Sequence, residues 1–213
     1  GSVRHYTDLD ALLRSEKVDA LVIATPPTEH KSAALAAAAR GIHVFCEKPM
    51  AASVEDCNAM IKACQDSGVL LMVAFKHRFT KAFSALKHRE SDLGDPLWAM
   101  YTYPLWRVDD PGWKFKEDGC RGIVVENMVH AIDALRYLVG DIARVYAEGD
   151  NFIFTDVKPP DSAIIALRFC NGAIGGLGGG CTSDRRISKE YLDIHYEHGI
   201  AQISGRLDQP YHL

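Results

Sequence analysis

Glu126, His130 and Asp133 are spaced so that they could carry out acid–base chemistry together. They stand at positions i, i+4 and i+7, which places all three on one face if the segment is helical. A histidine with a carboxylate one turn away on each side can be oriented for proton transfer near neutral pH. The alternative is a solvated polar face of a surface helix. Helical spacing alone favours the solvated face over one wall of a cleft.

Lys48 is a second candidate because of its place in the sequence Glu47-Lys48-Pro49. Proline disfavours the helical conformation for the residue before it, so we expect an extended lysine at the end of a strand over residues 42–46. A partly desolvated lysine at that place could exchange a proton near neutral pH. A surface lysine before a helix is the alternative, and a motif of three residues does not exclude it.

Two loops hold further candidates for binding. His30 follows T-P-P-T-E at the expected start of a helix, where free N–H groups and the helix dipole favour anionic ligand groups. A packing or capping role is commoner for a histidine at such a position. Trp106, Arg107 and Trp113 occupy the loop before the His130 segment, where they could roof a substrate pocket or simply pack.

The elements that must position these residues alternate between helix and strand in the first half. We expect helices over 8–16 (capped by Thr7), 30–40 and 53–67 (capped by Ser53), and strands over 18–25, 42–46 and 69–75. Short connections between them predict right-handed crossovers and a parallel sheet whose strands are buried on both faces. Ligands bind such sheets beyond the carboxyl ends of the strands, at the loops 25–30, 47–49 and 76–78.

The second half has a different pattern. We expect helices over 79–90 and 121–139, and strands over 97–103, 145–154, 162–169, 173–181, 191–196 and 200–204. This order predicts an α+β domain with a largely antiparallel sheet, and therefore two domains, 1–77 and 78–213. The glycine cluster at 172–180 matches no nucleotide-binding motif and predicts a strand that another sheet could approach closely.

Composition narrows the classes of function. The 213 residues include 24 basic and 28 acidic side chains with no basic block, which argues against a nucleic-acid partner or an anionic membrane surface. No apolar run approaches the roughly 20 residues that a membrane helix needs. The six cysteines show neither C-x-x-C nor zinc spacing, so we expect no metal site and a cytoplasmic protein with buried thiols.

Four motifs occur in order along nearly the whole chain: V-D-A-L-V-I-A-T-P-P-x-x-H at 18–30, G-I-H-V-F-C-E-K-P at 41–49, R-F at 78–79, and G-I-V-V-E-N-M-V-H-A-I-D at 122–133. Together they resemble the glucose–fructose oxidoreductase, inositol dehydrogenase and MocA (Gfo/Idh/MocA) family. The resemblance implies an α/β fold with a Rossmann domain for NAD or NADP. It also implies an α+β domain with an open sheet that closes the site and makes a homo-oligomer, a dimer or tetramer.

The resemblance further implies roles for individual residues. Lys48 would be the catalytic lysine, followed by a proline that is often cis, and His130 its acid–base partner. Glu126 stands where the family usually has aspartate, and its extra methylene moves the carboxylate by at least about 1 Å. Asp133 would orient the groups around the substrate. The positions that imply cofactor contacts are Thr25, Pro26, His30, Glu47, Lys48 and, near the nicotinamide, Arg78.

The implied reaction is hydride transfer between nicotinamide C4 and a carbinol carbon of a sugar, polyol or related hydroxy compound. Lys48 and His130 would manage the hydroxyl proton. The glycine-rich turn of the first βαβαβ half is not in this sequence, so we expect an incomplete Rossmann-type sheet that begins just before its fourth strand. Two alternatives stay open: a binding or scaffold subunit without redox turnover, and a non-redox lyase or glycosidase-type enzyme that reuses the Lys48/His130 pair.

Overall fold

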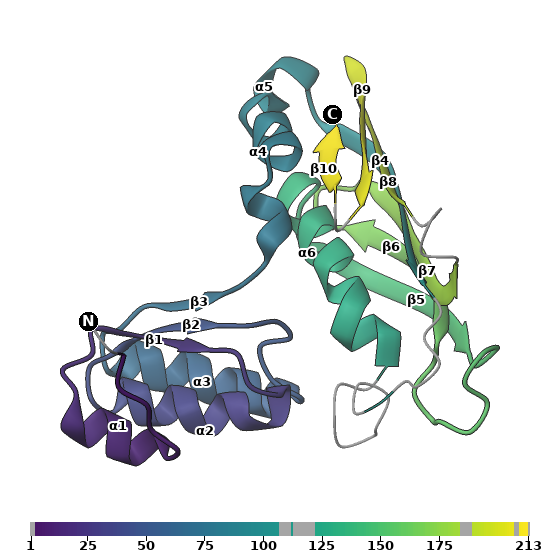
Figure 1. The fold of residues 1–213 in the computed structure, drawn as a ribbon. Helices are drawn as coiled ribbons and strands as arrows, with labels where there is room; N and C mark the ends of the chain where they lie inside the picture. Colours follow the sequence, from purple (N-terminus) through teal and green to yellow (C-terminus); the bar gives the residue numbers. More distant parts are fainter. Residues whose placement is uncertain (1–2, 107–111, 113–121, 184–188, 207–208, 213) are drawn as a thin grey trace. The chain divides into compact units, whose positions relative to one another are not determined.

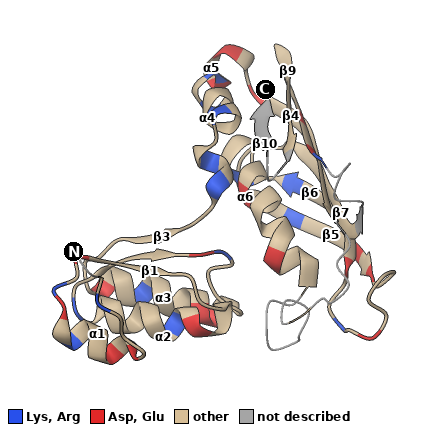
Figure 2. Cartoon of the chain, viewed as in Figure 1, with Lys and Arg blue, Asp and Glu red and all other residues tan. Residues whose placement is uncertain are grey.

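A computed structural model describes residues 3–106, 112, 122–183, 189–206 and 209–212. It divides the chain into two compact units, Gly1–Ala74 and Phe75–Leu213, and each is described by itself (Figure 1). The division falls three residues before the boundary expected from the sequence, so Phe75, Lys76 and His77 belong to the second unit. Acidic and basic residues are interspersed along the elements of both units (Figure 2). None of the described helices is long and apolar enough to cross a membrane.

The first unit has the expected alternation of helices and strands. Its elements are α1 (Leu9–Ser15), β1 (Ala20–Ile23), α2 (Pro27–Ala38), β2 (His43–Cys46), α3 (Val54–Asp66) and β3 (Leu71–Val73). The three strands form a parallel sheet in the order β1-β2-β3. Ser53 caps α3 as predicted, accepting a hydrogen bond from the Asp56 backbone at 3.1 Å. The cap of α1 is Asp8 and not Thr7, because the Asp8 carboxylate accepts from the Ala11 backbone at 2.8 Å.

This parallel sheet is covered on one face. Helix α2 packs against β1 and β2, and it contributes alanines to a core shared with β2 and α3. The opposite face carries the cross-strand row Val22, Phe45 and Met72, in which Val22 is 66% and Met72 42% exposed. The expectation that these strands are buried on both faces is therefore wrong for the described residues. The reason is that the described helices of this unit lie on the same side of the sheet (Figure 1).

The second unit is an α+β fold. Its helical elements are the 3₁₀ turn η1 (Lys76–Phe79), α4 (Lys81–His88), α5 (Glu90–Leu93), the π-helical turn η3 (Val124–Met128) and α6 (Val129–Leu138). Its strands are β4 (Pro96–Trp106), β5 (Ile142–Asp150), β6 (Ser162–Phe169), β7 (Ile174–Ser183), β8 (Glu190–Tyr196), β9 (Gly199–Arg206) and β10 (Gln209–His212).

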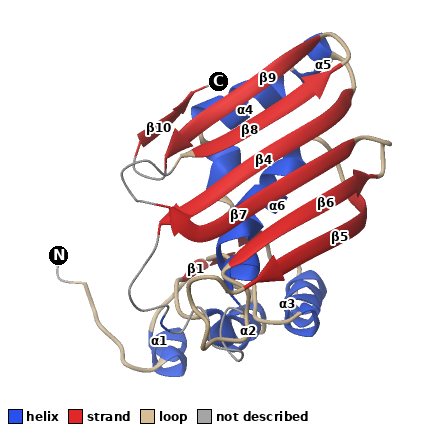
Figure 3. Ribbon diagram, turned by 90° about the vertical axis from the view of Figure 1, so that its right-hand side faces the viewer, coloured by secondary structure: helices blue, strands red, loops and turns tan. Residues whose placement is uncertain are grey.

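The described strands form one sheet in the order β10-β9-β8-β4-β7-β6-β5. Among their pairings, β4–β7 is parallel and the others are antiparallel, as the prediction of a largely antiparallel sheet requires. Helices α4 and α6 cover one face, and the other face is open (Figure 3). Strand β10 was not expected from the sequence.

Two expected helices have a different form. The helix predicted over 79–90 is broken into η1, α4 and α5, because Thr80 is extended and Arg89 leaves the helical region. The helix predicted over 121–139 is π-helical over Val124–Met128 before it becomes α-helical. A π-helical turn accommodates an extra residue and occurs frequently at functional sites.

The glycines of β7 let neighbouring strands of the same sheet come close, whereas the sequence suggested the approach of another sheet. Gly179 lies opposite Tyr103 in the β4–β7 pair. A Cβ atom at Gly179 would lie 2.5 Å from the Tyr103 carbonyl oxygen, a distance that backbone atoms cannot tolerate. The same Cβ would lie 3.4 Å from the Met128 Sδ atom, so Gly179 also leaves room for this buried side chain.

Candidate active site

The polar stripe of the helical segment 124–138 is buried. Glu126 is 5% exposed, His130 6% and Asp133 5%. The solvated face that helical spacing favoured is therefore wrong. Burial of three ionisable side chains is unfavourable unless they are paired or hydrogen-bonded, and such clusters concentrate at functional sites.

The π-helical turn explains how these residues can be buried beside a hydrophobic core. Glu126 lies within η3 and His130 at the start of α6, so the extra residue of the π turn separates them. Ile123 and Met128, from the same stretch, are fully buried in the core of the second unit. The helix thus presents apolar side chains to the sheet and still keeps its polar residues inside.

Asp133 is bound by Arg78. Both carboxylate oxygens accept hydrogen bonds from the guanidinium, at 2.8 Å from Nε and 2.5 Å from Nη2. This pairing raises the pKa of Arg78, and the guanidinium also lies 5.1 Å from the centroid of the Tyr137 ring. The bidentate geometry fixes Arg78 firmly. Asp133 thus orients Arg78, a residue expected to lie near the nicotinamide.

His77, which lies beside His130, belongs to a second group of buried polar residues that was not predicted from the sequence. The Tyr101 hydroxyl donates to Oε2 of Glu190 at 2.7 Å, and Nε2 of His77 lies 3.5 Å from the same oxygen. The ring centroids of His77 and His130 are 5.2 Å apart. These residues come from β4, β8 and η1, so no local spacing connects them. The only local signal is the alternation along β4, which turns Tyr101 and Tyr103 inward.

Burial controls the protonation of this group. It lowers the pKa of His77 to about 4, and the charge of Lys76 acts in the same direction. It also raises the pKa of Tyr103, and the carboxylates of Glu190 and Glu126 raise it further. Near neutral pH, His77 is therefore an uncharged imidazole and Tyr103 keeps its proton.

In the first unit, the candidate residues lie at the carboxyl ends of β1 and β2. Thr25 and Pro26 are exposed in the loop after β1, and Glu47 is exposed in the loop after β2. Lys48 is half-buried, and its peptide bond to Pro49 is cis, as the family resemblance implies. This is the sheet edge at which nucleotides bind in open parallel sheets, and the exposed loop residues fit that role.

His30 joins these two loops. Its Nε2 lies 2.8 Å from the Thr25 carbonyl oxygen and its Nδ1 lies 3.1 Å from that of Pro49. The side chain is fully buried, so its ring holds the loops in place and presents no surface to a ligand. The backbone around Thr25 and Pro49 is thereby fixed for residues that do reach solvent.

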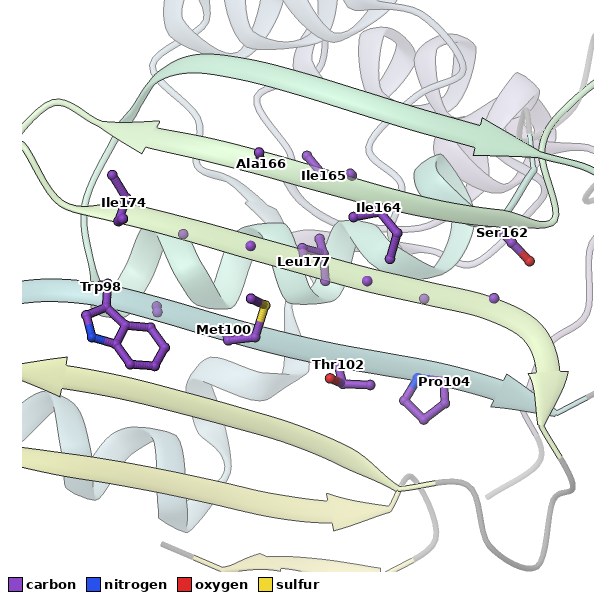
Figure 4. Close-up of a pocket in the computed structure, with 16 residues that line it drawn as sticks. Trp98, Met100, Thr102, Pro104, Ser162, Ile164, Ile165, Ala166, Ile174 and Leu177 are labelled. Atoms are coloured by element: carbon purple, nitrogen blue, oxygen red, sulfur yellow. The ribbon is translucent and has the colours of Figure 1, made fainter.

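Of the three loop residues expected to roof a substrate pocket, the structure describes one. Trp106 is the last residue of β4, and Arg107 and Trp113 lie outside the described residues. The open face of the sheet holds a hollow of about 670 Å³ between β4, β6 and β7 (Figure 4). Its lining is apolar or glycine with two hydroxyl side chains and includes no titratable group, so it does not fit an acid–base site.

Comparison with known proteins finds a matching family model for each of the two units. A family model described as "Oxidoreductase family, NAD-binding Rossmann fold" matches residues 2–75, and one described as "GFO/IDH/MocA C-terminal domain" matches residues 87–202. These matches cover both units and confirm the resemblance that the motifs indicated.

Individual relatives agree with this assignment. The chain is 33% identical over 181 residues to 2,7-anhydro-N-acetylneuraminate hydratase of Mediterraneibacter gnavus, covering 76% of this chain and 48% of the relative. It is 28% identical over 187 residues to myo-inositol 2-dehydrogenase of Thermotoga maritima, covering 82% and 53%. The chain thus spans about half the length of the curated relatives it matches.

A solved structure shows the same fold. The WlbA dehydrogenase from Bordetella pertussis, in complex with NADH and UDP-GlcNAcA, superposes with a TM-score of 0.87 at 28% identity. The superposition covers 95% of this chain and 60% of that one. With both units matched in sequence and in fold, the chain belongs to the Gfo/Idh/MocA family of oxidoreductases.

Proposed function

We propose that the protein is an NAD- or NADP-dependent oxidoreductase that transfers a hydride between nicotinamide and a carbon of a sugar, polyol or related hydroxy compound. The observation that carries this proposal is the burial of both Glu126, in the π-helical turn η3, and His130, at the start of α6, in a member of this family. The dehydrogenase relatives and the NADH complex of a structural neighbour support it.

The cofactor would be held by the loops at the carboxyl edge of the first unit and by Arg78. Thr25, Pro26 and Glu47 are exposed there, and Lys48 is half-buried. The Arg78 side chain is bound by Asp133 and is 39% exposed, so it stays accessible to a ligand. When bound, the nicotinamide supplies the hydride acceptor or donor.

The protein's own residues handle the proton. In the oxidation, the substrate hydroxyl gives its proton to a ring nitrogen of His130 while the carbinol carbon loses its hydrogen as hydride. Glu126 orients the imidazole and stabilises the charge that it gains. The Lys48 ammonium donates a hydrogen bond to the substrate oxygen and stabilises the negative charge that develops on it.

Replacement of Lys48 and His130 in the full-length enzyme tests this proposal. We expect Lys48→Ala and His130→Ala each to lower kcat by about 10²–10⁴-fold, the usual contribution of a positioned acid–base group. The affinity of His130→Ala for NADH, measured by fluorescence titration, should stay close to that of the wild type. A full rate of hydride transfer in either variant would refute the role of that residue, and absence of NADH binding by the wild type would favour a scaffold subunit.

A redox-neutral reaction is the second candidate. The observation that favours it is the 33% identity to a hydratase that acts on an anhydro sugar derivative. In such an enzyme the Lys48/His130 pair would serve proton transfer in addition or elimination. Product formation detected by mass spectrometry, with no net change in nicotinamide absorbance, would distinguish this function from a dehydrogenase.

We also propose that the protein is a cytoplasmic homo-oligomer that associates through the open face of its large sheet. Met100, Ile164 and Ile174 project from this face, and Ile164 is 67% exposed (Figure 4). Exposed apolar patches of this kind mark association sites. Light scattering should show a dimer or tetramer in the wild type and a smaller species for Ile164→Asp. A monomeric wild type would refute the proposal.

A further inference from the structure

His77 is a buried histidine that the proposed mechanism does not use. It is 1% exposed, and its ring lies beside that of His130 at 5.2 Å between centroids and an interplanar angle of 48°. Phe75 lies on another side of the His130 ring, at 6.5 Å and an angle of 85°. His77 and Phe75 therefore form two of the walls that restrict rotation of the His130 imidazole.

His77 is itself held in place from three other elements. Its ring stacks on Phe83 of α4, with centroids 5.0 Å apart and planes within 8°. Its Nε2 faces Oε2 of Glu190 at the start of β8, 3.5 Å away, and that oxygen accepts from the Tyr101 hydroxyl of β4 at 2.7 Å. The His77 ring also lies 5.2 Å from the His130 ring, measured between centroids. It thus connects the sheet with the residue at the start of α6.

The burial of Glu190 makes this connection specific. Glu190 is 5% exposed, and a buried carboxylate is strongly unfavourable without donors that face it. The Tyr101 hydroxyl and the His77 imidazole face it, and neither is an apolar side chain that packing alone would select. Such polar networks fix the geometry of the groups that they touch.

The groups around His77 and His130 indicate a role in orientation and not in proton transfer to substrate. The Tyr103 ring of β4 lies 6.4 Å from the His77 ring between centroids, and Glu190 of β8 faces its Nε2. The charge of Lys76, the preceding residue, acts on the same ring. His77 has almost no exposed surface, so it cannot touch a substrate directly.

We propose that His77, held by Glu190 and Tyr101, is a positioning residue that sets the orientation of the His130 imidazole for its reaction. This proposal rests on the proposed acid–base role of His130. It assigns to Tyr101 and Glu190 a part in turnover although both are buried away from substrate.

Variants of His77 and Tyr101 in the full-length enzyme test the proposal. His77→Phe keeps the stack on Phe83 but removes both ring nitrogens, and we expect kcat to fall about 10- to 100-fold with little change in KM. His77→Gln keeps an N–H donor near the position of Nε2 and should recover most of that loss. Tyr101→Phe should lower kcat in the same direction.

The matched control is Tyr196→Phe. Tyr196 lies on β8 like Glu190, and its buried hydroxyl has no hydrogen-bond partner among the described residues. Tyr101→Phe and Tyr196→Phe therefore both remove one buried hydroxyl, but only the first touches Glu190. We expect wild-type kcat for Tyr196→Phe.

An NMR measurement separates this proposal from the proposed function. The side-chain nitrogen resonances of His130 report its tautomer and environment independently of activity, and they should shift in Tyr101→Phe and His77→Phe but not in Tyr196→Phe. Should His130→Ala be inactive while His77→Phe and Tyr101→Phe keep wild-type kcat and His130 resonances, the positioning role would be overturned. Full activity of His130→Ala would instead refute the proposed function, and the NMR shifts would still decide whether His77 positions His130.

Discussion

The candidate residues of the two units are positioned in opposite ways. At the carboxyl edge of the first unit, Thr25, Pro26 and Glu47 are exposed on loops that one buried histidine, His30, holds together. In the second unit, Glu126, His130 and Asp133 are buried among side chains from several elements. Function and stability can therefore change separately at the first site, whereas they are coupled at the second.

We expect this coupling to be strongest in the pH dependence of stability. Because burial lowers the pKa of His77 from 6.5 to about 4, the unfolded chain takes up this proton near pH 6.5 and the folded protein only near pH 4. The stability is therefore complete above pH 6.5 and falls as the pH decreases to 4. At about 1.4 kcal/mol for each pH unit, the contribution of His77 is about 3 kcal/mol.

Urea denaturation at pH 7 and pH 4.5 measures this contribution. The decrease in the free energy of unfolding should be smaller in His77→Gln than in the wild type. Replacement of the exposed His198 by glutamine should leave the decrease unchanged. Equal decreases in His77→Gln and the wild type would show that the buried histidine is not coupled to stability.

Removal of Arg78 should give the next largest effect. Arg78→Ala leaves the buried Asp133 carboxylate without its bidentate partner, and we expect a loss of about 2–3 kcal/mol in the free energy of unfolding. The matched control is Arg136→Ala, because its partner Asp141 is 71% exposed and exposed pairs contribute about 0–1 kcal/mol. Comparable losses in the two variants would contradict the difference between buried and exposed pairs.

Gly179→Ala tests the close approach of β7 to β4. The added Cβ would lie 2.5 Å from the Tyr103 carbonyl oxygen, so β4 and β7 must separate, and we expect a loss of about 2 kcal/mol. Gly178→Ala is the control, since its Cβ would meet only the flexible end of the Ile164 side chain. Thermal unfolding, monitored by circular dichroism, compares the Tm values of the two variants. An unchanged Tm for Gly179→Ala would mean that the two strands accommodate the methyl group without separating.

Thr25→Ala should have the smallest effect on stability. Thr25 is exposed in the loop after β1, and substitutions at exposed sites usually change the free energy of unfolding by less than about 0.5 kcal/mol. If the loop contacts the cofactor, the same variant should weaken NADH binding in a fluorescence titration. A loss of stability without a loss of NADH affinity would reverse the proposed contrast between the two sites.

The sequence predicted the first unit well because the relevant signals are local. Caps, helix-ending glycines and short apolar runs lie within a few residues of the elements they define, and Ser53 caps α3 as expected. The covered and uncovered faces of the sheet could not be predicted, since the run 18–25 is apolar on both sides.

The buried cluster of the second unit could be predicted only in part. Helical spacing brought Glu126, His130 and Asp133 together but could not show whether their face meets water or protein. Tyr101 and Glu190 meet through the pairing of β4 with β8, strands that are far apart in the sequence, and His77 reaches Glu190 from η1. The π-helical turn also has no composition that distinguishes it from an α-helix.

The parallel pairing of β4 with β7 also affects how this unit folds. Trp98 pairs with Ile174, so the centre of the sheet joins segments 76 positions apart (174 minus 98). Pairings between such distant segments form slowly, because the entropy cost of closing a long loop comes before any favourable contact forms. During synthesis, strand β4 and helix α6 emerge well before β7 does, and the hydrophobic side chains of β4 have no partner strand until then. An unpaired strand edge of this kind is prone to aggregation until the chain is long enough to cover it.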